Sequence, residues 1–318
     1  MKAIVCTKYG PPEGLVLREV ARPIPKDDEI LIKIHATSVT ASDALIRAMN
    51  QPFLLRCLLQ AIFGFGKPRN PILGMTLSGV VESSGKTVTS FEKGDKVFAY
   101  CSMSATKMRF GSYAEYICLP AEHWNVLTKP TNLTHEQAAA LPYGGFLAWH
   151  CIKKAHIQSG QKVLIYGASG SIGSMAVQLA KNAGADVTAV CSGNNFELAK
   201  SIGADHVIDY TCKDAVSQLE RYDFVLDAVG NSKTSALKTV SKSALTAGGR
   251  YMSIDDELPS APLEDFIKLK QMAEQGKLVP VIDRSFPLEE MAQAHAYVDK
   301  GHKKGNVVIS VTPEADKF

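Results

Sequence analysis

The stretch Lys162-Val-Leu-Ile-Tyr-Gly-Ala-Ser-Gly-Ser-Ile-Gly173, followed by the helical pattern Ser174 to Ala183, decides the fold of this 318-residue chain. Its first part, Val163 to Tyr166, is a short apolar run typical of a buried parallel strand. Three glycines then separate this strand from a helix with an apolar face. A strand, a glycine turn and a helix start in this order predict a dinucleotide-binding fold, and an ordinary strand-to-helix connection is the alternative.

Each glycine of the turn has its own expected role. Gly167 allows the tight turn, Gly170 lets a pyrophosphate approach the backbone, and Gly173 lets the helix pack closely. The phosphate would lie on the unpaired N–H groups at the start of the helix. The residues of the turn expected to contact the cofactor are Gly167, Ser169, Gly170, Ser171, Ile172 and Gly173.

The residues that follow continue the alternation of strands and helices. Strands are predicted at Asp186–Cys191, His206–Asp209, Tyr222–Asp227 and Arg250–Ile254, with helices at Phe196–Ile202 and Lys233–Ser243. Such alternation predicts an α/β fold with a parallel, doubly wound sheet, and ligands bind at the carboxyl ends of its strands. Further cofactor contacts are therefore expected from Ser192, Tyr210, Val229, Gly230, Ser253 and Ile254.

The residues after the second strand, Cys191-Ser-Gly-Asn-Asn195, bear on the type of nicotinamide cofactor. An acidic residue here would bind the free 2′-hydroxyl of NADH and repel the 2′-phosphate of NADPH. These five positions hold no acid, so NADPH is favoured, and Lys200 and Lys213 are candidate cations for its phosphate. A plain hydrophilic turn is the alternative. The expected donors to the phosphate are Ser192, Asn194 and Asn195.

Composition limits the classes of function. The net charge of +3 is spread without a basic block, which argues against nucleic-acid binding. Seven widely spaced cysteines without a C-x-x-C pair suggest neither a disulfide framework nor a zinc knuckle, and they indicate a reducing compartment. The first residues form a strand pattern and lack the features of a signal peptide, so a cytoplasmic location is expected.

The apolar segment Phe53 to Gly66 is the one stretch that bears on membranes. It is far shorter than the roughly 20 apolar residues that a membrane span requires, so no integral span is expected. A buried or pocket-covering helix is the favoured interpretation. A shallow contact with the membrane interface, which a lipid-soluble substrate would suit, is the alternative.

The first 120 residues have a different pattern. Glu29 to Ala36 alternates as a half-buried strand, and Leu77–Glu82 and Lys96–Tyr100 are short strands between turn residues. A proline-marked connection then leads into the nucleotide domain, and the last segment, Leu263 to Val311, is expected to return to the β-rich module. The predicted domains are residues 1–122 with 262–318, and residues 123–261.

Several motifs follow one another along the chain: Ala36-Thr-Ser-Val-Thr-Ala-Ser-Asp43, Pro71-Ile-Leu-Gly-Met-Thr-Leu-Ser-Gly-Val-Val81, Glu92-Lys-Gly-Asp-Lys-Val97, Gly111-Ser-Tyr-Ala-Glu-Tyr116, the glycine turn, Gly203-Ala-Asp-His-Val-Ile-Asp-Tyr210 and Gly301-His-Lys-Lys-Gly-Asn-Val-Val308. In this order they resemble a medium-chain dehydrogenase/reductase, within the zinc-independent NADPH:quinone oxidoreductase branch related to zeta-crystallin. The resemblance covers nearly the whole chain. It implies a GroES-like catalytic domain, built from both chain ends, that faces a Rossmann domain across an active-site cleft.

The resemblance also shows where zinc ligands would stand. Zinc-using relatives need a Cys in the Thr-Ala-Ser-Asp stretch, a His-Glu pair after Gly74 and a further Cys near Pro142. Here those places hold Thr40, Met75-Thr76 and Leu141-Pro-Tyr-Gly-Gly145, which cannot supply the expected thiolate or imidazole ligands. No metal is therefore expected.

The resemblance implies reductive chemistry without a metal. NADPH supplies a hydride to a small hydrophobic acceptor, either a quinone or the β-carbon of an α,β-unsaturated carbonyl, while the protein positions the partners. Ser42 and Tyr143 are the candidate catalytic side chains, as donors to the developing oxygen. An exposed tip is one interpretation of Tyr143 and a packed tyrosine at a domain boundary the other. Ser42 stands where zinc relatives carry a proton-relay hydroxyl, or it caps the helix Asp43 to Met49.

Two departures from the family remain. Leu147 replaces a hydroxyl residue that many relatives carry near the cofactor. Only Asp255 to Pro262 follows the fifth strand, where relatives insert a helix and a sixth strand that makes the dimer. A five-stranded sheet is therefore predicted, with a monomer or a dimer made by another surface. These departures keep open a second hypothesis, a non-catalytic NADPH-binding protein of a redox-responsive or crystallin-like kind.

Overall fold

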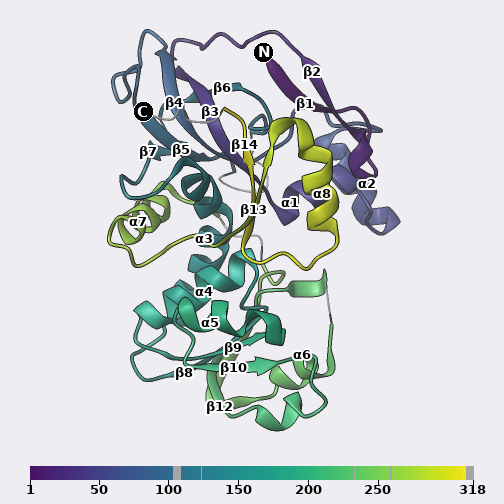
Figure 1. The fold of residues 1–318 in the computed structure, drawn as a ribbon, viewed down its shortest axis with the longest axis vertical. Helices are drawn as coiled ribbons and strands as arrows, with labels where there is room; N and C mark the ends of the chain where they lie inside the picture. Colours follow the sequence, from purple (N-terminus) through teal and green to yellow (C-terminus); the bar gives the residue numbers. More distant parts are fainter. Residues whose placement is uncertain (103–108, 123, 233, 258–259, 313–318) are drawn as a thin grey trace. The chain divides into compact units, whose positions relative to one another are not determined.

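The structure is a computed structural model that describes residues 1–102, 109–122, 124–232, 234–257 and 260–312 (Figure 1). The chain divides into two compact units. The first contains Met1–Pro142, Ala261–Ile267 and Ile282–Phe318, and the second contains Tyr143–Ser260 and Lys268–Val281.

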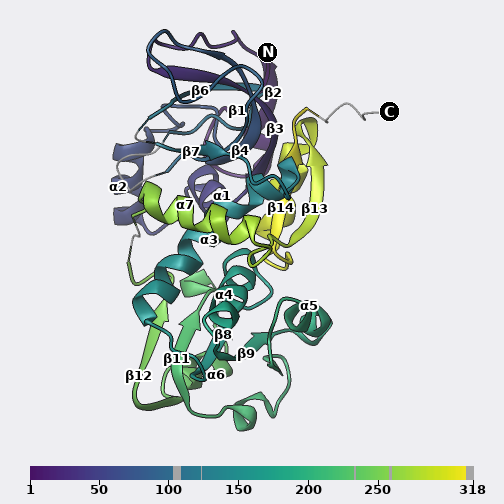
Figure 2. The same cartoon turned by 90° about the vertical axis from the view of Figure 1, so that its left-hand side faces the viewer.

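The second unit is built on a parallel sheet with the strand order β10-β9-β8-β11-β12. Helix α4 packs on β8 and β9, as Figures 1 and 2 show. The chain runs from β8 outward to β10 on one side and then to β11 and β12 on the other. The order reverses between β8 and β11, which is the place where ligands bind in doubly wound sheets. The strands are β8 Lys162–Tyr166, β9 Asp186–Cys191, β10 His206–Asp209, β11 Tyr222–Asp227 and β12 Leu245–Ser253; the helices are α4 Ser171–Asn182, α5 Phe196–Ser201 and α6 Ala236–Ser241.

The predicted α/β fold is confirmed, and so are five strands within the described residues. The buried runs of β8 and β11 are fully apolar at their centres, which is why both were recognisable from the sequence. Strand β12 begins at Leu245, five residues before the predicted start, since Leu245 pairs with Tyr222; the register then shifts so that Arg250 pairs with Phe224. The helix predicted over 233–243 covers Ala236–Ser241; Lys233 itself lies outside the described residues.

The first unit contains a sheet with the order β13-β14-β3-β4-β5-β7, in which β6 also pairs with β3, and a two-stranded sheet of β1 and β2. The chain end returns to this unit, because β14 pairs antiparallel with β3, but Lys268–Val281 of the segment predicted to return belongs to the second unit. The strands are β1 Lys2–Cys6, β2 Leu15–Glu19, β3 Glu29–Val39, β4 Thr76–Ser84, β5 Lys96–Tyr100, β6 Tyr116–Pro120, β7 Asn125–Thr128, β13 Ile282–Pro287 and β14 Asn306–Ser310; the helices are α1 Ala41–Ala48, α2 Phe53–Phe63 and α8 Met291–Asp299. Two further helices, α3 His135–Ala155 and α7 Leu263–Glu274, each have residues in both units.

The change from the first unit to the second falls between Pro142 and Tyr143, inside α3, and not near residue 122. Strand β7 keeps the intervening residues in the first unit because it pairs with β5. The predicted connection marked by Lys129-Pro130 and Leu141-Pro142 does lead to the second unit, but its second part is helical, since α3 continues through Pro142. Burial of the neighbouring Ala138–Leu141 offsets the cost of a proline inside a helix, about 3 kcal/mol.

Within the apolar segment 53–66, residues Phe53–Phe63 form helix α2, and none of the α2 residues is buried. The expectation of a buried helix is therefore wrong, whereas a pocket-covering role stays a prediction. None of the helices in the described ranges has both the length and the apolar character needed to cross a membrane.

Candidate cofactor site and catalytic residues

The glycine turn after β8 has the geometry of a close-packed strand-to-helix connection. Gly167 has a φ of +82°, and a Cβ built on it would lie 2.3 Å from Cγ2 of Val229. A Cβ on Gly173 would lie 2.1 Å from the carbonyl oxygen of Gly167. Both positions therefore exclude a side chain. The turn after β8 also touches the loop after β11, so the residues expected at the reversal of strand order lie together.

The start of α4 has backbone N–H groups that the helix itself does not use. Gly170 is the N-cap residue of α4, and no side chain caps this end. Ser171, Ile172 and Gly173 form the first turn, whose N–H groups have no partner within the helix. A Cβ on Gly170 would have only the carbonyl oxygen of Gly167 nearby, at 3.4 Å. The backbone at Gly170 is thus open to an approaching group, as a pyrophosphate site requires.

Three polar side chains meet beside this turn. The amide of Asn195 donates to Oγ of Ser169 and to Oγ of Ser192, each at 3.1 Å. Asn195 is only 9% exposed, and its Oδ1 has no hydrogen-bond partner among the described residues. Because each serine accepts from Asn195, each keeps its own O–H to donate to an anionic ligand. Asn194 lies exposed in the same turn, and Lys200 and Lys213 are also exposed.

The sequence interpretation missed an acid at this edge. Asp209, at the end of β10, accepts from the backbone N–H of Gly193 at 2.8 Å. It also accepts from the N–H and hydroxyl of Thr211 at 2.9 and 2.7 Å. These bonds, that of the Thr211 hydroxyl first, lower the pKa of Asp209, so it is ionised at neutral pH. The parallel pairing of β9 with β10 brings Asp209 here, and the residues directly after β9 do not reveal it.

A second cluster lies after β11. Asp227 is 2% exposed and accepts from the N–H groups of Val229 and Gly230, at 3.0 and 3.1 Å. The ammonium of Lys238, itself buried, lies 2.8 Å from Asp227 and also donates to the carbonyl oxygen of Gly230. The hydroxyl of Tyr251 donates to Asp227 at 3.1 Å. Asp227 and Lys238 therefore fix the Val229–Gly230 loop. The sequence signal for this cluster is an Asp at the last position of a predicted strand, Asp227.

The remaining predicted cofactor contacts lie at the ends of their strands. Ser253 and Ile254 line a small pocket that also contains Leu147, His150, Cys151, Met252 and Glu257. Leu147, which departs from the family pattern, thus lies beside two predicted contact residues. Tyr210 follows β10, is 36% exposed, and has its ring 6.3 Å from that of Tyr166.

The structure corrects the interpretation of Tyr143 as an exposed tip. Tyr143 lies inside α3 and is only 8% exposed. The neighbouring Gly144 approaches the start of α4, since a Cβ on it would lie 2.5 Å from the carbonyl oxygen of Ser171. The side chain is therefore packed and not an exposed tip, and the catalytic role of its hydroxyl stays a prediction.

The alternative interpretation of Ser42, as the cap of the helix, is wrong. Helix α1 begins at Ala41 and Thr40 is its N-cap: the Thr40 hydroxyl accepts from the N–H of Asp43 at 3.1 Å. Asp43 in return accepts from the N–H of Thr40 at 3.0 Å, which completes a capping box. Ser42 lies half-buried in the first turn. Thr40, at the place where zinc relatives carry a ligand, is therefore the N-cap of α1.

Asp43 belongs to a buried polar group of the first unit. Burial raises its pKa to about 6 and lowers that of His295 to about 3. Tyr113 lies between them, with its hydroxyl 3.2 Å from Nε2 of His295. Arg47 is 2% exposed and makes a bidentate ion pair with Asp299 at 2.6 Å. These side chains were not singled out as functional from the sequence. Within the described ranges, no three His, Cys, Asp or Glu residues come together to hold a metal ion.

Two family models match the chain. The alcohol dehydrogenase GroES-like domain matches residues 26–131, and the zinc-binding dehydrogenase matches residues 171–283. The first match lies in the first unit, and the second includes the start of α4 and the strands that follow it.

Known proteins resemble the chain over most of its length. The 2-methylene-furan-3-one reductase of Solanum lycopersicum is 33% identical over 98% of this chain and 80% of its own length. The mitochondrial NAD(P)H oxidoreductase RTN4IP1 of Mus musculus is 32% identical over 98% of this chain and 89% of its own. The solved quinone oxidoreductase of Coxiella burnetii superposes with a TM-score of 0.81 at 27% identity, covering 98% of this chain and 99% of that one. With these matches and the site geometry together, the chain belongs to the medium-chain dehydrogenase/reductase superfamily, in its zeta-crystallin-like branch.

Proposed function

We propose that this protein is an NADPH-dependent oxidoreductase that reduces a quinone or the β-carbon of an α,β-unsaturated carbonyl. The observation that carries the proposal is the open Gly170 backbone at the start of α4, next to the reversal of strand order. The names of the tomato and Coxiella relatives, an enone reductase and a quinone oxidoreductase, support the two acceptor classes.

The described residues fit a dinucleotide. The N–H groups of Ser171, Ile172 and Gly173 would hold the pyrophosphate, and Ser169 and Ser192 would donate to the 2′-phosphate. Asp227 and Lys238 would keep the Val229–Gly230 loop in place for the nicotinamide half, with Tyr210, Ser253 and Ile254 at the neighbouring strand ends. The bound cofactor supplies a hydride to the acceptor.

The preference for NADPH over NADH rests on opposing groups. The hydroxyls of Ser169 and Ser192 favour a phosphate, whereas the ionised Asp209 beside Gly193 opposes it. We propose that the hydrogen bonds from the two hydroxyls outweigh the repulsion by Asp209, so that NADPH binds more tightly than NADH. Replacement of Asp209 by Asn should raise kcat/KM for NADPH relative to NADH by about fivefold, the effect of one nearby surface charge. The control is Asp214→Asn, an exposed acid five positions later, and equal ratios in all three proteins would refute the assignment.

The proton that completes the reduction comes from solvent or from a weak acid, and the hydroxyls of Ser42 and Tyr143 are proposed to donate hydrogen bonds to the oxygen on which negative charge develops. Ser42→Ala and Tyr143→Phe should each lower kcat with little change in the dissociation constant of NADPH if they act on the acceptor. Unchanged kcat in both variants would leave backbone N–H groups as the donors and remove these assignments.

We propose that the reaction is zinc-independent. The positions where zinc relatives carry ligands hold Thr40, Met75 and Leu141, and none of these side chains binds zinc as thiolate or imidazole. Metal analysis of the active protein should find no stoichiometric zinc. All seven cysteines are unpaired, which supports a reducing compartment, and we propose the cytoplasm. We also propose a small hydrophobic molecule, and not a nucleic acid, as the substrate.

The function is tested by mixing NADPH with the protein and a panel of quinones and alkenals, and following absorbance of the reduced nicotinamide. Acceptor-dependent oxidation is expected. Tight binding of NADPH without such oxidation would instead support a non-catalytic NADPH-binding protein.

A further inference from the structure

Helix α2 presents a continuous apolar surface to solvent. Leu54, Leu58 and Ile62 are spaced four residues apart and form one stripe along the helix. They are 82%, 59% and 46% exposed. The flanking Phe53 and Phe65 are 68% and 70% exposed. The surface, called the α2 stripe below, consists of Phe53, Leu54, Leu55, Leu58, Ile62 and Phe65.

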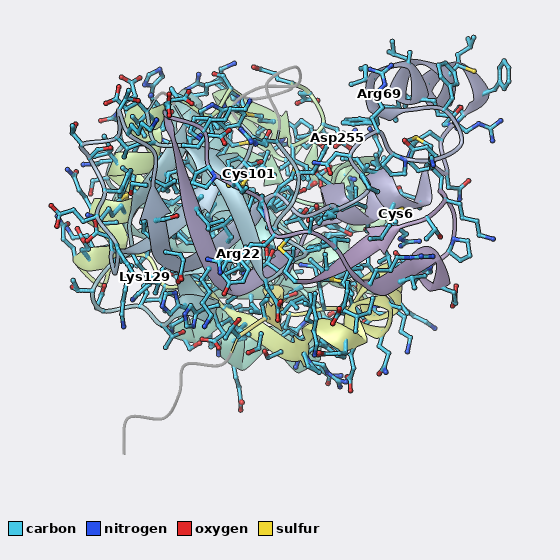
Figure 3. All side chains as sticks on the ribbon, turned by 90° about the horizontal axis from the view of Figure 1, so that it is seen from above. Cys6, Arg22, Arg69, Cys101, Lys129 and Asp255 are labelled. Carbon is cyan, nitrogen blue, oxygen red and sulfur yellow. The ribbon has the colours of Figure 1, made fainter. Side chains whose placement is uncertain are left out.

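The opposite side of α2 holds the helix to the first unit. Phe63 packs edge-on against Phe110, with ring centroids 5.8 Å apart, at the border of a buried cluster. Arg69 donates to the carbonyl oxygen of Ala61 at 2.9 Å, at the end of α2 where Figure 3 labels it. Tyr9 donates to the carbonyl oxygen of Gly64 at 3.0 Å. Because these contacts fix the helix, the stripe is not the face that packs on the protein. An amphipathic helix of a globular protein normally buries its apolar face.

The charged residues of the segment that contains α2 are of one sign. No Asp or Glu occurs between Asp43 and Glu82, whereas Arg56, Lys67 and Arg69 are exposed in this interval. The other cation of the interval, Arg47, is buried and paired with Asp299. A large apolar surface edged by cations is complementary to an anionic lipid surface, where apolar side chains enter the acyl boundary and Lys and Arg meet the headgroups. A second copy of the stripe would bring like charges together, which disfavours self-association.

We propose that α2 docks this protein on the surface of an anionic phospholipid bilayer. With 11 residues the helix is too short to span a bilayer and would lie in the interface. The inference goes beyond the proposed oxidoreductase activity and does not depend on it.

Sedimentation of the full chain with vesicles tests the proposal. The protein should bind vesicles of phosphatidylcholine mixed with phosphatidylglycerol, bind phosphatidylcholine vesicles more weakly, and be released by high salt. Arg56→Gln and Lys67→Gln should each weaken binding about fivefold, since one cation near an anionic surface contributes that factor. The matched control is Lys86→Gln with Lys93→Gln, two exposed lysines elsewhere in the first unit.

The apolar part of the surface needs its own variants. Leu54→Glu with Leu58→Glu should abolish binding, whereas Ile24→Glu, at an apolar residue 87% exposed outside α2, should leave it intact. Because both leucines are exposed, the melting temperature should not change. As a check without new charge, Leu54→Trp should give a blue-shifted emission on addition of the anionic vesicles.

Three results would overturn the proposal. The wild-type protein could stay in the supernatant with anionic vesicles. The double glutamate variant could sediment as the wild type does. A concentration-dependent dimer that this variant abolishes, without vesicle binding, would assign the stripe to a second copy of the chain.

Discussion

Gly173 and Gly170 lie three residues apart in the turn but have different surroundings. A Cβ at 173 would lie 2.1 Å from a backbone oxygen, whereas one at 170 would have nothing closer than 3.4 Å. Gly173→Ala should therefore lower the free energy of unfolding by about 1–3 kcal/mol, the range for overpacking. Gly170→Ala should leave stability nearly unchanged and still weaken NADPH binding, because its methyl group would stand in the path of the phosphate.

Urea unfolding and titration of NADPH measure the two effects separately. Equal losses of stability in the two variants would contradict the packing assignment. Unchanged NADPH affinity in Gly170→Ala would contradict the phosphate site.

His295 and Asp43 should make opposite contributions to the pH dependence of stability. The pKa of His295 is about 3 in the folded protein and 6.5 ordinarily, so its contribution is lost as pH falls below about 6.5. The pKa of Asp43 is raised from 3.8 to about 6, so its contribution instead grows as pH falls from 6 to 4. The two slopes, about 1.4 kcal/mol per pH unit each, largely cancel in this window.

Removal of one histidine should unmask the other slope. His295→Gln should become more stable as pH falls from 6 to 4, measured as the urea midpoint, while the exposed His302→Gln follows the wild type. Parallel profiles for His295→Gln and the wild type would show that His295 titrates normally.

Among the elements, the link from β11 to α6 carries a buried ion pair. Asp227 and Lys238 are 3% and 8% exposed as side chains and lie 2.8 Å apart. Lys238→Met should cost about 3–5 kcal/mol, because it leaves a buried carboxylate without its cation. Combining it with Asp227→Asn should recover part of the loss. Lys242→Met, an exposed lysine next to α6, is the control for urea unfolding, and equal losses in both lysine variants would contradict the ion-pair account.

The sequence predicted those elements whose formation depends on their own residues. Strands β9, β10 and β11 match their predicted bounds because each is a short apolar run between turn residues. The predictions were wrong where residues distant in the sequence determine whether a segment is helical or buried. Pro142 lies inside α3 because its neighbours are buried in the first unit, and α2 leaves its apolar side exposed although its composition indicates burial.

The same distinction holds for the candidate site: its local parts could be predicted from the sequence, and the parts that join distant segments could not. The glycine roles follow from local backbone geometry and could be assigned in advance, as Gly167 and Gly173 illustrate. Asp209 could not be placed beside Gly193 without the pairing of β9 and β10. The buried group of Asp43, Tyr113 and His295 joins three distant segments, so no spacing in the sequence reveals it.

For the whole molecule, the position of β12 at the edge of the five-stranded sheet leads to a prediction of the oligomeric state. Relatives are expected to form dimers through a sixth strand, which is not among the described elements of this sheet. Light scattering in detergent-free buffer should give the mass of one chain, 34.3 kDa, or of a dimer that does not use β12. A dimer with its two sheets paired edge to edge at β12 would contradict the prediction.

The most direct test of the central claim is a single kinetic assay on the purified full chain. NADPH, a quinone or a 2-alkenal, and the protein are mixed without added metal, and loss of reduced nicotinamide is followed with and without acceptor. The proposed function predicts oxidation that depends on both protein and acceptor, is faster with NADPH than with NADH, and is weakened in Gly170→Ala. Saturable NADPH binding with no acceptor-dependent oxidation across the panel would contradict it.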